Sequence, residues 1–210
     1  MTPILWSFRR CPYAMRARLA LASAGQTVEL REVVLRDKPP AFLATSPSAT
    51  VPCLDGPDGV IDESLDIMLW ALRRRDPEAL LDMPTEGFDL VEICDGAFKS
   101  ALDRYKYASR YENADPETER ARAGDFIIRL NDSLSGQAWL FGPGPTLADL
   151  AILPFVRQFA HVDLDWFAAQ PWDDVQRWLD AFKASGRFRS IMTKYPPWPP
   201  GHVFPAPGPG

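Results

Sequence analysis

Cys11 combines a residue type and a position that could give a reactive thiol. It follows a short apolar run at 4–8 that predicts a strand, and Pro12 directly after it is typical of the first turn of a helix. A sulfur at a helix N-terminus faces unpaired backbone N–H groups and the positive end of the helix dipole, and both stabilise thiolate over thiol. We therefore expect the pKa of Cys11 to be depressed and its sulfur to be nucleophilic near neutral pH. The alternative is a small buried residue at a strand end.

No second thiol stands beside Cys11 in the sequence. A Cys-x-x-Cys arrangement would have its second cysteine three positions on, and that position is Ala14. A mixed disulfide at Cys11 would then be released by an outside thiol, for which glutathione is the abundant cytoplasmic candidate. Cys53 could resolve the disulfide from across the sheet, although its strand context favours a core residue. Cys94 is predicted to be a core residue as well.

Val51 and Pro52 precede a short predicted strand and could bind an extended peptide. A cis bond between them would turn the N–H and C=O groups of Val51 outward, free to pair with a peptide as an added strand. The alternative is an ordinary proline at the head of a strand.

Glu63 and Ser64 stand at the predicted N-terminus of a helix. Free N–H groups there can hold a carboxylate, the Ser64 hydroxyl can add a hydrogen bond, and Glu63 can meet an ammonium. The pair therefore suits an α-amino acid head group. Taken alone, it is also part of an ordinary capping sequence.

A small α/β unit is needed to bring these candidates together. Apolar runs and helical spacing predict strands at 4–8, 27–35, 51–54 and 60–61, and helices at 12–25 and 63–75. After this part no strand signal is left, and helices are predicted at 89–111, 115–134, 146–160 and 172–185. Thr146 to Asp149 resembles a capping box with Asp in place of Glu or Gln, to which we assign a structural role.

Composition excludes several classes of function. The chain of 210 residues has a formal net charge of −5, so it lacks the basic excess that binding to nucleic acid or to anionic membranes requires. No apolar run approaches the roughly 18 residues of a membrane span, and the N-terminus does not resemble an export signal, so we expect a cytoplasmic protein. Two histidines and three widely spaced cysteines argue against a metal site and a disulfide framework.

In this order and spacing, the motifs resemble those of the cytosolic glutathione transferases over most of the chain. Residues 7–19, Ser-Phe-Arg-Arg-Cys-Pro-Tyr-Ala-Met-Arg-Ala-Arg-Leu, look like the cysteine-bearing, omega-type branch. The resemblance implies a thioredoxin-like α/β N-terminal domain (β-α-β-α-β-β-α) followed by an all-α C-terminal helical domain. We place these at 1–76 and 85–194, with a linker at 77–84 and a Pro/Gly-rich tail at 195–210.

The resemblance also implies a role for each candidate residue. Cys11 would be the thiol that bonds to glutathione, with Tyr13 and Lys38 lining the site. Val51, ahead of Pro52, would pair with the cysteinyl backbone. Glu63 and Ser64 would hold the γ-glutamyl end.

Two segments depart from the pattern of this family. Where the family usually has a glycine before its Val-Pro, this chain has Ser-Pro-Ser-Ala-Thr at 46–50. The tail is also unlike a standard ending. It either folds back over the acceptor pocket or forms a solvated polyproline segment, and we favour the second.

An acceptor pocket is expected between the two domains, lined by the helix that carries residues 104–111. Tyr105, Ala108 and Tyr111 are the candidates, because tyrosines and cations there could stack on an aromatic acceptor or attract an anionic one. The alternative is a core tyrosine beside a solvated helix face.

The leading hypothesis is a glutathione-dependent thiol transferase or reductase that acts through the Cys11 thiolate. Its partners would be glutathione, as co-substrate, and an unidentified small electrophile or glutathionylated substrate. The alternatives are reductive chemistry on quinones or haloaromatics, again through Cys11, and a non-catalytic member of the fold that binds a protein partner. The resemblance also implies a homodimer.

Overall fold

The computed structural model describes residues 2–205 and divides the chain into two compact units. The first unit takes in the described residues up to Ala79 together with those from Ala184 onward, and the second runs from Leu80 to Lys183. The segment after Ala184, which the sequence prediction divided between the helical domain and the tail, thus packs with the α/β unit.

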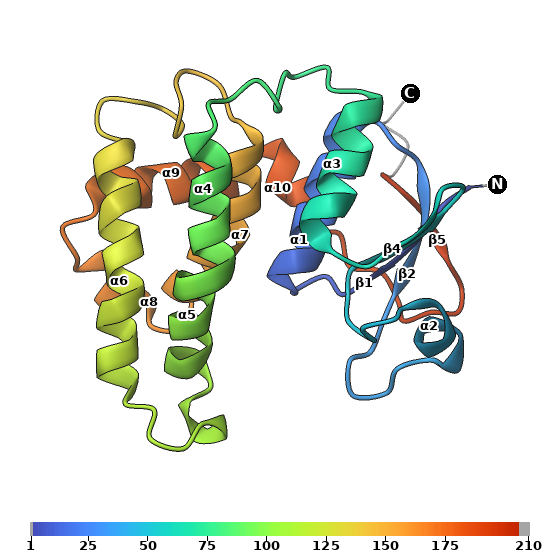
Figure 1. The fold of residues 1–210 in the computed structure, drawn as a ribbon, viewed down its shortest axis with the longest axis horizontal. Coiled ribbons are helices and arrows are strands. Elements are labelled where there is room, and N and C mark those ends of the chain that lie inside the picture. The colour runs from blue at the N-terminus through green and yellow to red at the C-terminus, as the bar shows by residue number, and fades with distance from the viewer. Residues whose placement is uncertain (1, 206–210) are drawn as a thin grey trace. The chain divides into compact units, whose positions relative to one another are not determined.

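The first unit is built on a five-stranded sheet in the order β4-β3-β1-β2-β5 (Figure 1). β1 pairs in parallel with β2, and the other three pairings are antiparallel. The strands are β1 (Ile4–Ser7), β2 (Val28–Glu32), β3 (Cys53–Gly56), β4 (Gly59–Ile61) and β5 (His202–Phe204).

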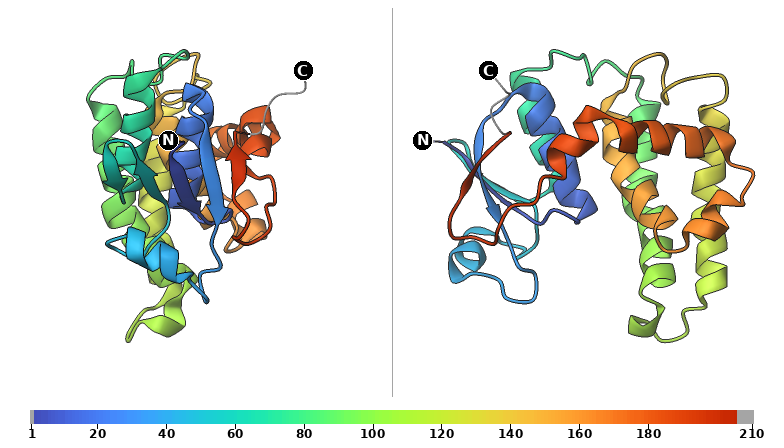
Figure 2. Two further views of the ribbon diagram at one scale, coloured as in Figure 1. Left: turned by 90° about the vertical axis from the view of Figure 1, so that its right-hand side faces the viewer. Right: turned by 180° about the vertical axis from the view of Figure 1, so that it is seen from behind.

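Helices cover both faces of this sheet (Figures 1 and 2). α1 (Pro12–Ala24) and α3 (Ser64–Arg74) pack together on one face, and α2 (Pro40–Thr45) lies on the other. α10 (Gly186–Ile191) packs against α1. Up to α3 the order is β-α-β-α-β-β-α, which confirms the predicted fold class of this unit. α2 was expected only from the resemblance, because Pro39 and Pro40 obscure the helical spacing of this six-residue helix.

Residues 195–205 correct the expectation of a solvated tail at 195–210, and the remaining residues of that tail, 206–210, lie outside the described part of the chain. β5 pairs antiparallel with β2, and the backbone N–H of Trp198 donates to the carbonyl of Glu32 at 2.9 Å. Figure 2 shows β5 alongside β2 at the edge of the sheet. Without β5, β2 would be an edge strand with open hydrogen-bonding groups, and pairing also buries Phe204. This three-residue strand was not predicted because it lies in a proline-rich segment and is stabilised only by its pairing with β2.

The second unit is all-helical, as predicted. The helix expected at 89–111 is a composite that ends at Lys106, because Tyr107 leaves helical geometry at φ −121°; a 3₁₀ turn (Ala108–Arg110) follows. Two short helices, α8 (Leu164–Ala168) here and α10 in the first unit, were not predicted. The elements of this unit are α4 (Glu86–Ile93), a π-helical turn (Cys94–Phe98), α5 (Lys99–Lys106), α6 (Pro116–Ser133), α7 (Leu147–Ala160), α8 (Leu164–Ala168) and α9 (Asp173–Ala184).

Asp149 holds the start of α7 inside the helical unit. Its fully buried carboxylate accepts hydrogen bonds from the N–H and hydroxyl groups of Thr146, the N–H of Leu140 and the indole N–H of Trp178, at 2.8–3.1 Å. The capping box predicted from Thr146 and Asp149 is therefore present. The hydrogen bond from the Trp178 indole also ties α9 to the Asp149 carboxylate at the start of α7.

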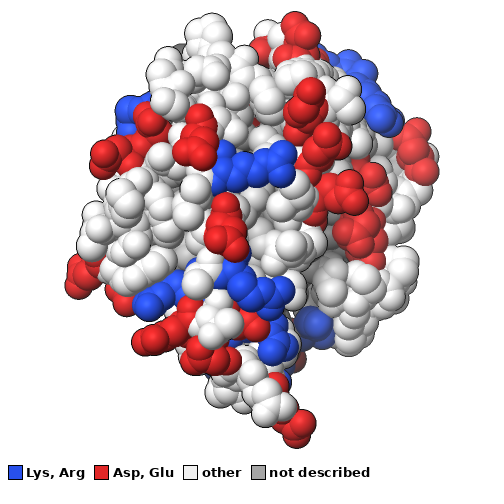
Figure 3. Space-filling view, turned by 60° about the vertical axis from the view of Figure 1, so that its left-hand side comes forward, with Lys and Arg blue, Asp and Glu red and all other residues white. Residues whose placement is uncertain are grey.

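Within residues 2–205, no helix is long and apolar enough to cross a membrane, and no three His, Cys, Asp or Glu side chains gather to hold a metal. On the face drawn in Figure 3, basic side chains are interspersed with acidic ones and do not form a continuous patch. This distribution accords with the net charge of −5.

Candidate functional site

Cys11 lies between β1 and α1, at the N-cap of the helix, with Pro12 in the first turn. Its backbone N–H donates to the carbonyl of Phe8 at 3.0 Å, which closes a turn after β1. The side chain is partly exposed, and its sulfur donates to the carbonyl oxygen of Val51 at 3.6 Å. The structure thus brings together two of the predicted site residues that are 40 positions apart in the chain.

Two features of this position act on the Cys11 sulfur in opposite directions. The N-terminus of α1 favours the thiolate through the positive end of the helix dipole. The Val51 carbonyl accepts a hydrogen bond from the Cys11 thiol and therefore favours the protonated form. A ligand that pairs with the Val51 backbone would compete for that carbonyl and leave the sulfur to the helix N-terminus.

The peptide bond between Val51 and Pro52 is cis, as the binding hypothesis requires. The Val51 side chain is buried in an apolar cluster with Trp6, Phe42 and Cys53, against which Cys11 also packs. The segment that would pair with a peptide is therefore anchored in the core.

Lys38 supports the loop that leads into Val51. Its Nζ donates to the carbonyl oxygen of Ala49 at 2.9 Å. The ammonium group thus binds the chain's own backbone two residues before Val51. A direct contact of Lys38 with glutathione stays a prediction.

Asp62 is a contributor that the sequence analysis did not single out. Its carboxylate accepts from the hydroxyl of Ser46 and the N–H of Ser48, both at 2.7 Å, and so ties the loop at 46–50 to the end of β4. Partial burial acts to raise the pKa of Asp62, but these hydrogen bonds outweigh it and hold the pKa below its ordinary value. The ionised clamp is therefore present at neutral pH and is lost only as pH falls through that lowered pKa. The Asp-Glu-Ser sequence at 62–64 predicted a helix cap and did not indicate the contact between Asp62 and the loop at 46–50.

Replacing Ala49 with glycine is expected to stabilise the protein. Ala49 has φ 54°, in the left-handed region that costs a non-glycine residue roughly 1–2 kcal/mol. The greater freedom of glycine in the unfolded chain offsets about 0.5–1 kcal/mol of that gain. We expect Ala49→Gly to raise the free energy of unfolding by about 0.5–1 kcal/mol in urea titrations.

Ala79→Gly is the matched control, because Ala79 also has φ 54° but stands outside the candidate site. It should give a similar gain in stability. Both variants should keep glutathione binding, since Lys38 contacts a backbone oxygen at Ala49. A loss of stability in Ala49→Gly would contradict the strain that we assign to this loop.

Glu63 and Ser64 lie where the sequence predicted, at the N-cap and first residue of α3. Ser64 is buried, and its hydroxyl lies 3.5 Å from Nη1 of the fully buried Arg16. The Arg16 guanidinium also lies 5.7 Å from the ring centre of Tyr13, so one cation on α1 links two predicted site residues. Glu63 is exposed and lines a hollow of about 540 Å³ between β4 and α3.

Cys53 lies on β3 in the same apolar cluster as Val51 and is fully buried. Burial, together with the negative charge of Asp62, raises the pKa of its thiol to about 12. At pH 8 only about one Cys53 thiol in 10⁴ would be ionised. This supports the interpretation of Cys53 as a core residue over that of a resolving thiol.

The three predicted acceptor residues lie in the helical unit and have local partners. The Tyr105 ring packs 5.8 Å from that of Phe159, and the ring of the exposed Tyr111 lies 5.2 Å from the guanidinium of Arg104. Ala108 begins the 3₁₀ turn after α5. Tyr105 is thus partly a core residue, as the alternative held, and the acceptor role of all three stays a prediction.

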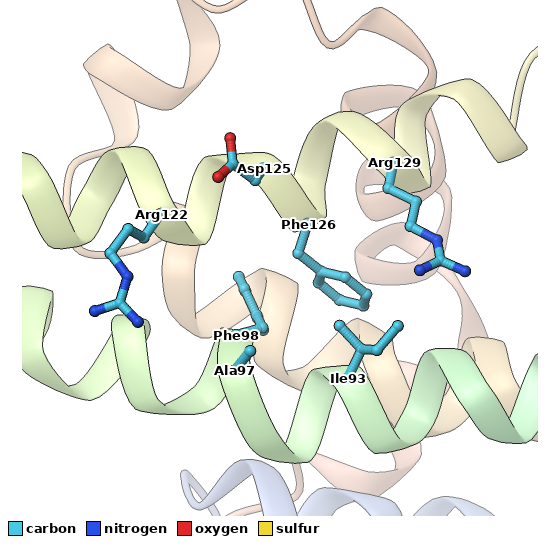
Figure 4. Close-up of a pocket in the computed structure, with 7 residues that line it drawn as sticks. All are labelled: Ile93, Ala97, Phe98, Arg122, Asp125, Phe126 and Arg129. Atoms are coloured by element: carbon cyan, nitrogen blue, oxygen red, sulfur yellow. The ribbon is translucent and has the colours of Figure 1, made fainter.

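A separate hollow of about 330 Å³ opens between α4, the π-helical turn and α6. Figure 4 shows Phe126 and Ile93 pointing toward one another across it, with Arg122 and Arg129 on either side. None of the three predicted acceptor residues lines it. It is therefore a feature apart from the predicted acceptor pocket.

Two family models match the chain. The model of the glutathione S-transferase N-terminal domain matches residues 5–79, and that of the C-terminal domain matches residues 108–181. A probable glutathione transferase of Aplysia californica is 42% identical over 57 residues, which are 27% of this chain. The match spans 62% of the length of that curated relative.

Solved structures share the fold. A glutathione transferase family member from Pseudomonas fluorescens, with two glutathione bound, has a TM-score of 0.78 at 20% identity and covers 91% of this chain and 92% of its own. Glutathione transferase Omega 3C of Trametes versicolor has a TM-score of 0.76 at 19% identity, with coverage of 94% and 91%. A Pseudomonas putida glutathione transferase with glutathione disulfide bound has a TM-score of 0.76 at 19% identity, with coverage of 91% and 90%.

Proposed function

This chain belongs to the glutathione S-transferase superfamily, and on that premise we propose that it is a glutathione-dependent thiol transferase of the cysteine-bearing, omega-like branch. One observation carries the proposal. The partly exposed sulfur of Cys11 stands at the N-terminus of α1 and contacts the backbone of Val51, at the cis bond to Pro52. The sulfur that we propose as the nucleophile thus lies beside the backbone groups that we propose to hold the peptide thiol.

The proposed reaction runs through a mixed disulfide. The Cys11 thiolate attacks the glutathione sulfur of a glutathionylated substrate, the substrate's S–S bond breaks, and the substrate thiolate leaves and takes up a proton. A second glutathione, as thiolate, attacks the bond between Cys11 and glutathione. Glutathione disulfide leaves, and the Cys11 thiolate is restored.

The other candidate residues hold glutathione in this proposal. The Val51 backbone pairs with the cysteinyl residue, and the start of α3 receives the γ-glutamyl carboxylate through Ser64 and free N–H groups. Glu63, which is exposed, meets the ammonium. Tyr13 and Lys38 line the rest of the proposed glutathione site.

Conventional conjugation is expected to be weak. It activates the sulfur of glutathione itself and calls for a hydroxyl donor close to that sulfur. Ser7, the serine at the end of β1, is fully buried, and its hydroxyl accepts a hydrogen bond from Nε of Arg18 at 2.9 Å. It is therefore engaged inside the fold.

Mass spectrometry after exposure to glutathione disulfide tests the proposal. We expect one glutathione adduct per chain, mapped to Cys11 by peptide analysis and removed by added glutathione. Cys53 and Cys94 are buried, so they should stay unmodified below pH 8 in the folded protein. An unmodified Cys11, or an adduct chiefly on Cys53, would contradict the proposed role.

The rival functions make different predictions in the same assay. A reductase for quinones or haloaromatics would form the Cys11 adduct but turn over those substrates and not glutathionylated thiols. A non-catalytic binding module would form no adduct and would not be retained on glutathione agarose. We also propose a homodimer in the cytosol, where glutathione keeps thiols reduced; light scattering of the purified protein tests the dimer.

A further inference from the structure

Glu32, the last residue of β2, links the loop that bears Cys11 to a buried cation. Its Oε2 lies 2.5 Å from Nη2 of Arg18, and its Oε1 accepts the backbone N–H of Arg9 at 2.7 Å. We propose that Glu32 is a positioning residue that sets the reactivity of Cys11 through the loop at 8–11. The proposal rests on the proposed function only in naming Cys11 as the reacting group.

Arg18 is a fixed anchor for this carboxylate. Its side chain is fully buried, and besides Glu32 it donates to the hydroxyl of Ser7 at 2.9 Å and to the carbonyl of Ile191 at 3.0 Å. Burial lowers the pKa of Arg18, and the charge of Glu32 opposes that shift. Because Arg18 is also bonded to Ser7 of β1 and Ile191 of α10, it would stay in place if Glu32 moved. The Arg18 guanidinium therefore fixes the position of the Glu32 carboxylate.

Arg9 ties the loop at 8–11 to β2 and to the segment after α10. Arg9 stands two positions before Cys11, and the Cys11 N–H bonds back to Phe8, so Arg9 lies within the turn that presents the sulfur. The Arg9 side chain also reaches the carbonyl of Met192 at 3.4 Å. Both bonds involve an ionised group, and the bond to Glu32 is the shorter and is the one that holds the backbone of the loop.

The C-terminal segment holds Glu32 from its other side. The N–H of Trp198 donates to the carbonyl of Glu32 at 2.9 Å, and the Trp198 ring packs edge-on against Trp6 with centres 5.1 Å apart. Trp198 and Cys11 both pack against the apolar cluster that contains Trp6. The strand end that carries Glu32 is thus clamped between the core and the C-terminal segment.

Only a carboxylate of this length satisfies both partners, because both of its oxygens accept. In Glu32→Gln one of the two oxygens is replaced by an NH₂ group, which can only donate. The remaining oxygen stays with Arg18, because a buried guanidinium without an acceptor would cost more than an unpaired backbone N–H. The NH₂ group then faces the N–H of Arg9, and this clash of two donors displaces the loop. Glu32→Asp keeps the charge for Arg18 but is one methylene too short to reach Arg9 as well.

The test measures the alkylation rate of Cys11 by iodoacetamide in the full-length protein at 25 °C, with thermal unfolding recorded separately. We expect Glu32→Gln to change that rate at least about tenfold in protein that is still folded, because the sulfur leaves its place at the helix N-terminus. Glu29→Gln is the matched control. It lies on the same strand, and its carboxylate pairs with Arg31 at 2.7 Å, not with the loop. Its rate should match that of the wild type.

Glu32→Asp keeps the test decisive if Glu32→Gln does not fold. Retention of the buried charge pair should preserve the fold, and the lost contact to Arg9 should still change the rate. A wild-type alkylation rate in a folded Glu32 variant would overturn the inference, whatever its melting temperature. Alkylation needs no glutathione, so a changed rate without any thiol transfer in the wild type would refute the proposed function and leave this inference standing.

Discussion

Cys11→Ser and Cys11→Ala are both expected to lose thiol transfer, by on the order of 10³-fold or more, together with the glutathione adduct. Neither side chain can form a disulfide. Cys53, in the cluster against which residue 11 packs, cannot replace the thiol because it is buried and its pKa is about 12. The measurement is the rate of reduction of a glutathionylated peptide at a fixed glutathione concentration.

The two variants should differ from each other in conjugation. A serine hydroxyl at this place can donate a hydrogen bond to the sulfur of glutathione, whereas alanine cannot. We therefore expect Cys11→Ser, but not Cys11→Ala, to exceed the wild type in conjugating glutathione to a chlorinated nitrobenzene. Such a gain would also indicate that glutathione still binds when the thiol is gone.

Cys94→Ala is the control for this series. Cys94 is a buried thiol in the π-helical turn of the other unit, so its removal should leave thiol transfer unchanged apart from any loss of stability. Full thiol transfer in both Cys11 variants would contradict a mechanism through a mixed disulfide at Cys11. A loss in Cys94→Ala of similar size, in folded protein, would move the chemistry away from Cys11.

Local sequence signals predicted the elements that carry the site. Pro12 behind Cys11 predicted the start of α1. The helix predicted at 115–134 also begins as expected, with Asp115 as the N-cap of α6, where its carboxylate accepts from the N–H of Thr118 at 2.9 Å. Such signals work because a cap is satisfied by residues within one turn of itself. The apolar patterns of the first 75 residues likewise predicted β1 to β4, α1 and α3, but not α2 or β5.

The contacts that connect distant segments could not be predicted in the same way. Asp62 looked like a local cap, yet it binds Ser46 and Ser48 across the site, and Lys38 turned inward to Ala49. β5 has only three residues within a proline-rich stretch, and its pairing depends on the open edge of β2. Each of these depends on which groups the folded chain leaves unsatisfied, and that is a property of the tertiary structure.

Asp149→Ala is expected to be the most damaging substitution for the stability of the helical unit. It would leave four buried donors without their acceptor: the N–H and hydroxyl of Thr146, the N–H of Leu140 and the indole N–H of Trp178. A buried donor left unsatisfied costs about 1–3 kcal/mol, and with partial relaxation we expect a total loss of about 3–5 kcal/mol in urea unfolding. That is a large share of the roughly 5–15 kcal/mol that stabilises a typical domain.

Asp163→Ala separates this network from simple helix capping. Asp163 caps α8 from an exposed position through one bond to the N–H of Trp166 at 3.0 Å, so its loss should cost only about 1 kcal/mol. Asp149→Asn should fall between the two, because the amide oxygen can still accept while its NH₂ group opposes one of the donors. Equal losses in Asp149→Ala and Asp163→Ala would mean that the buried carboxylate acts only as a helix cap and does not join α9 to α7.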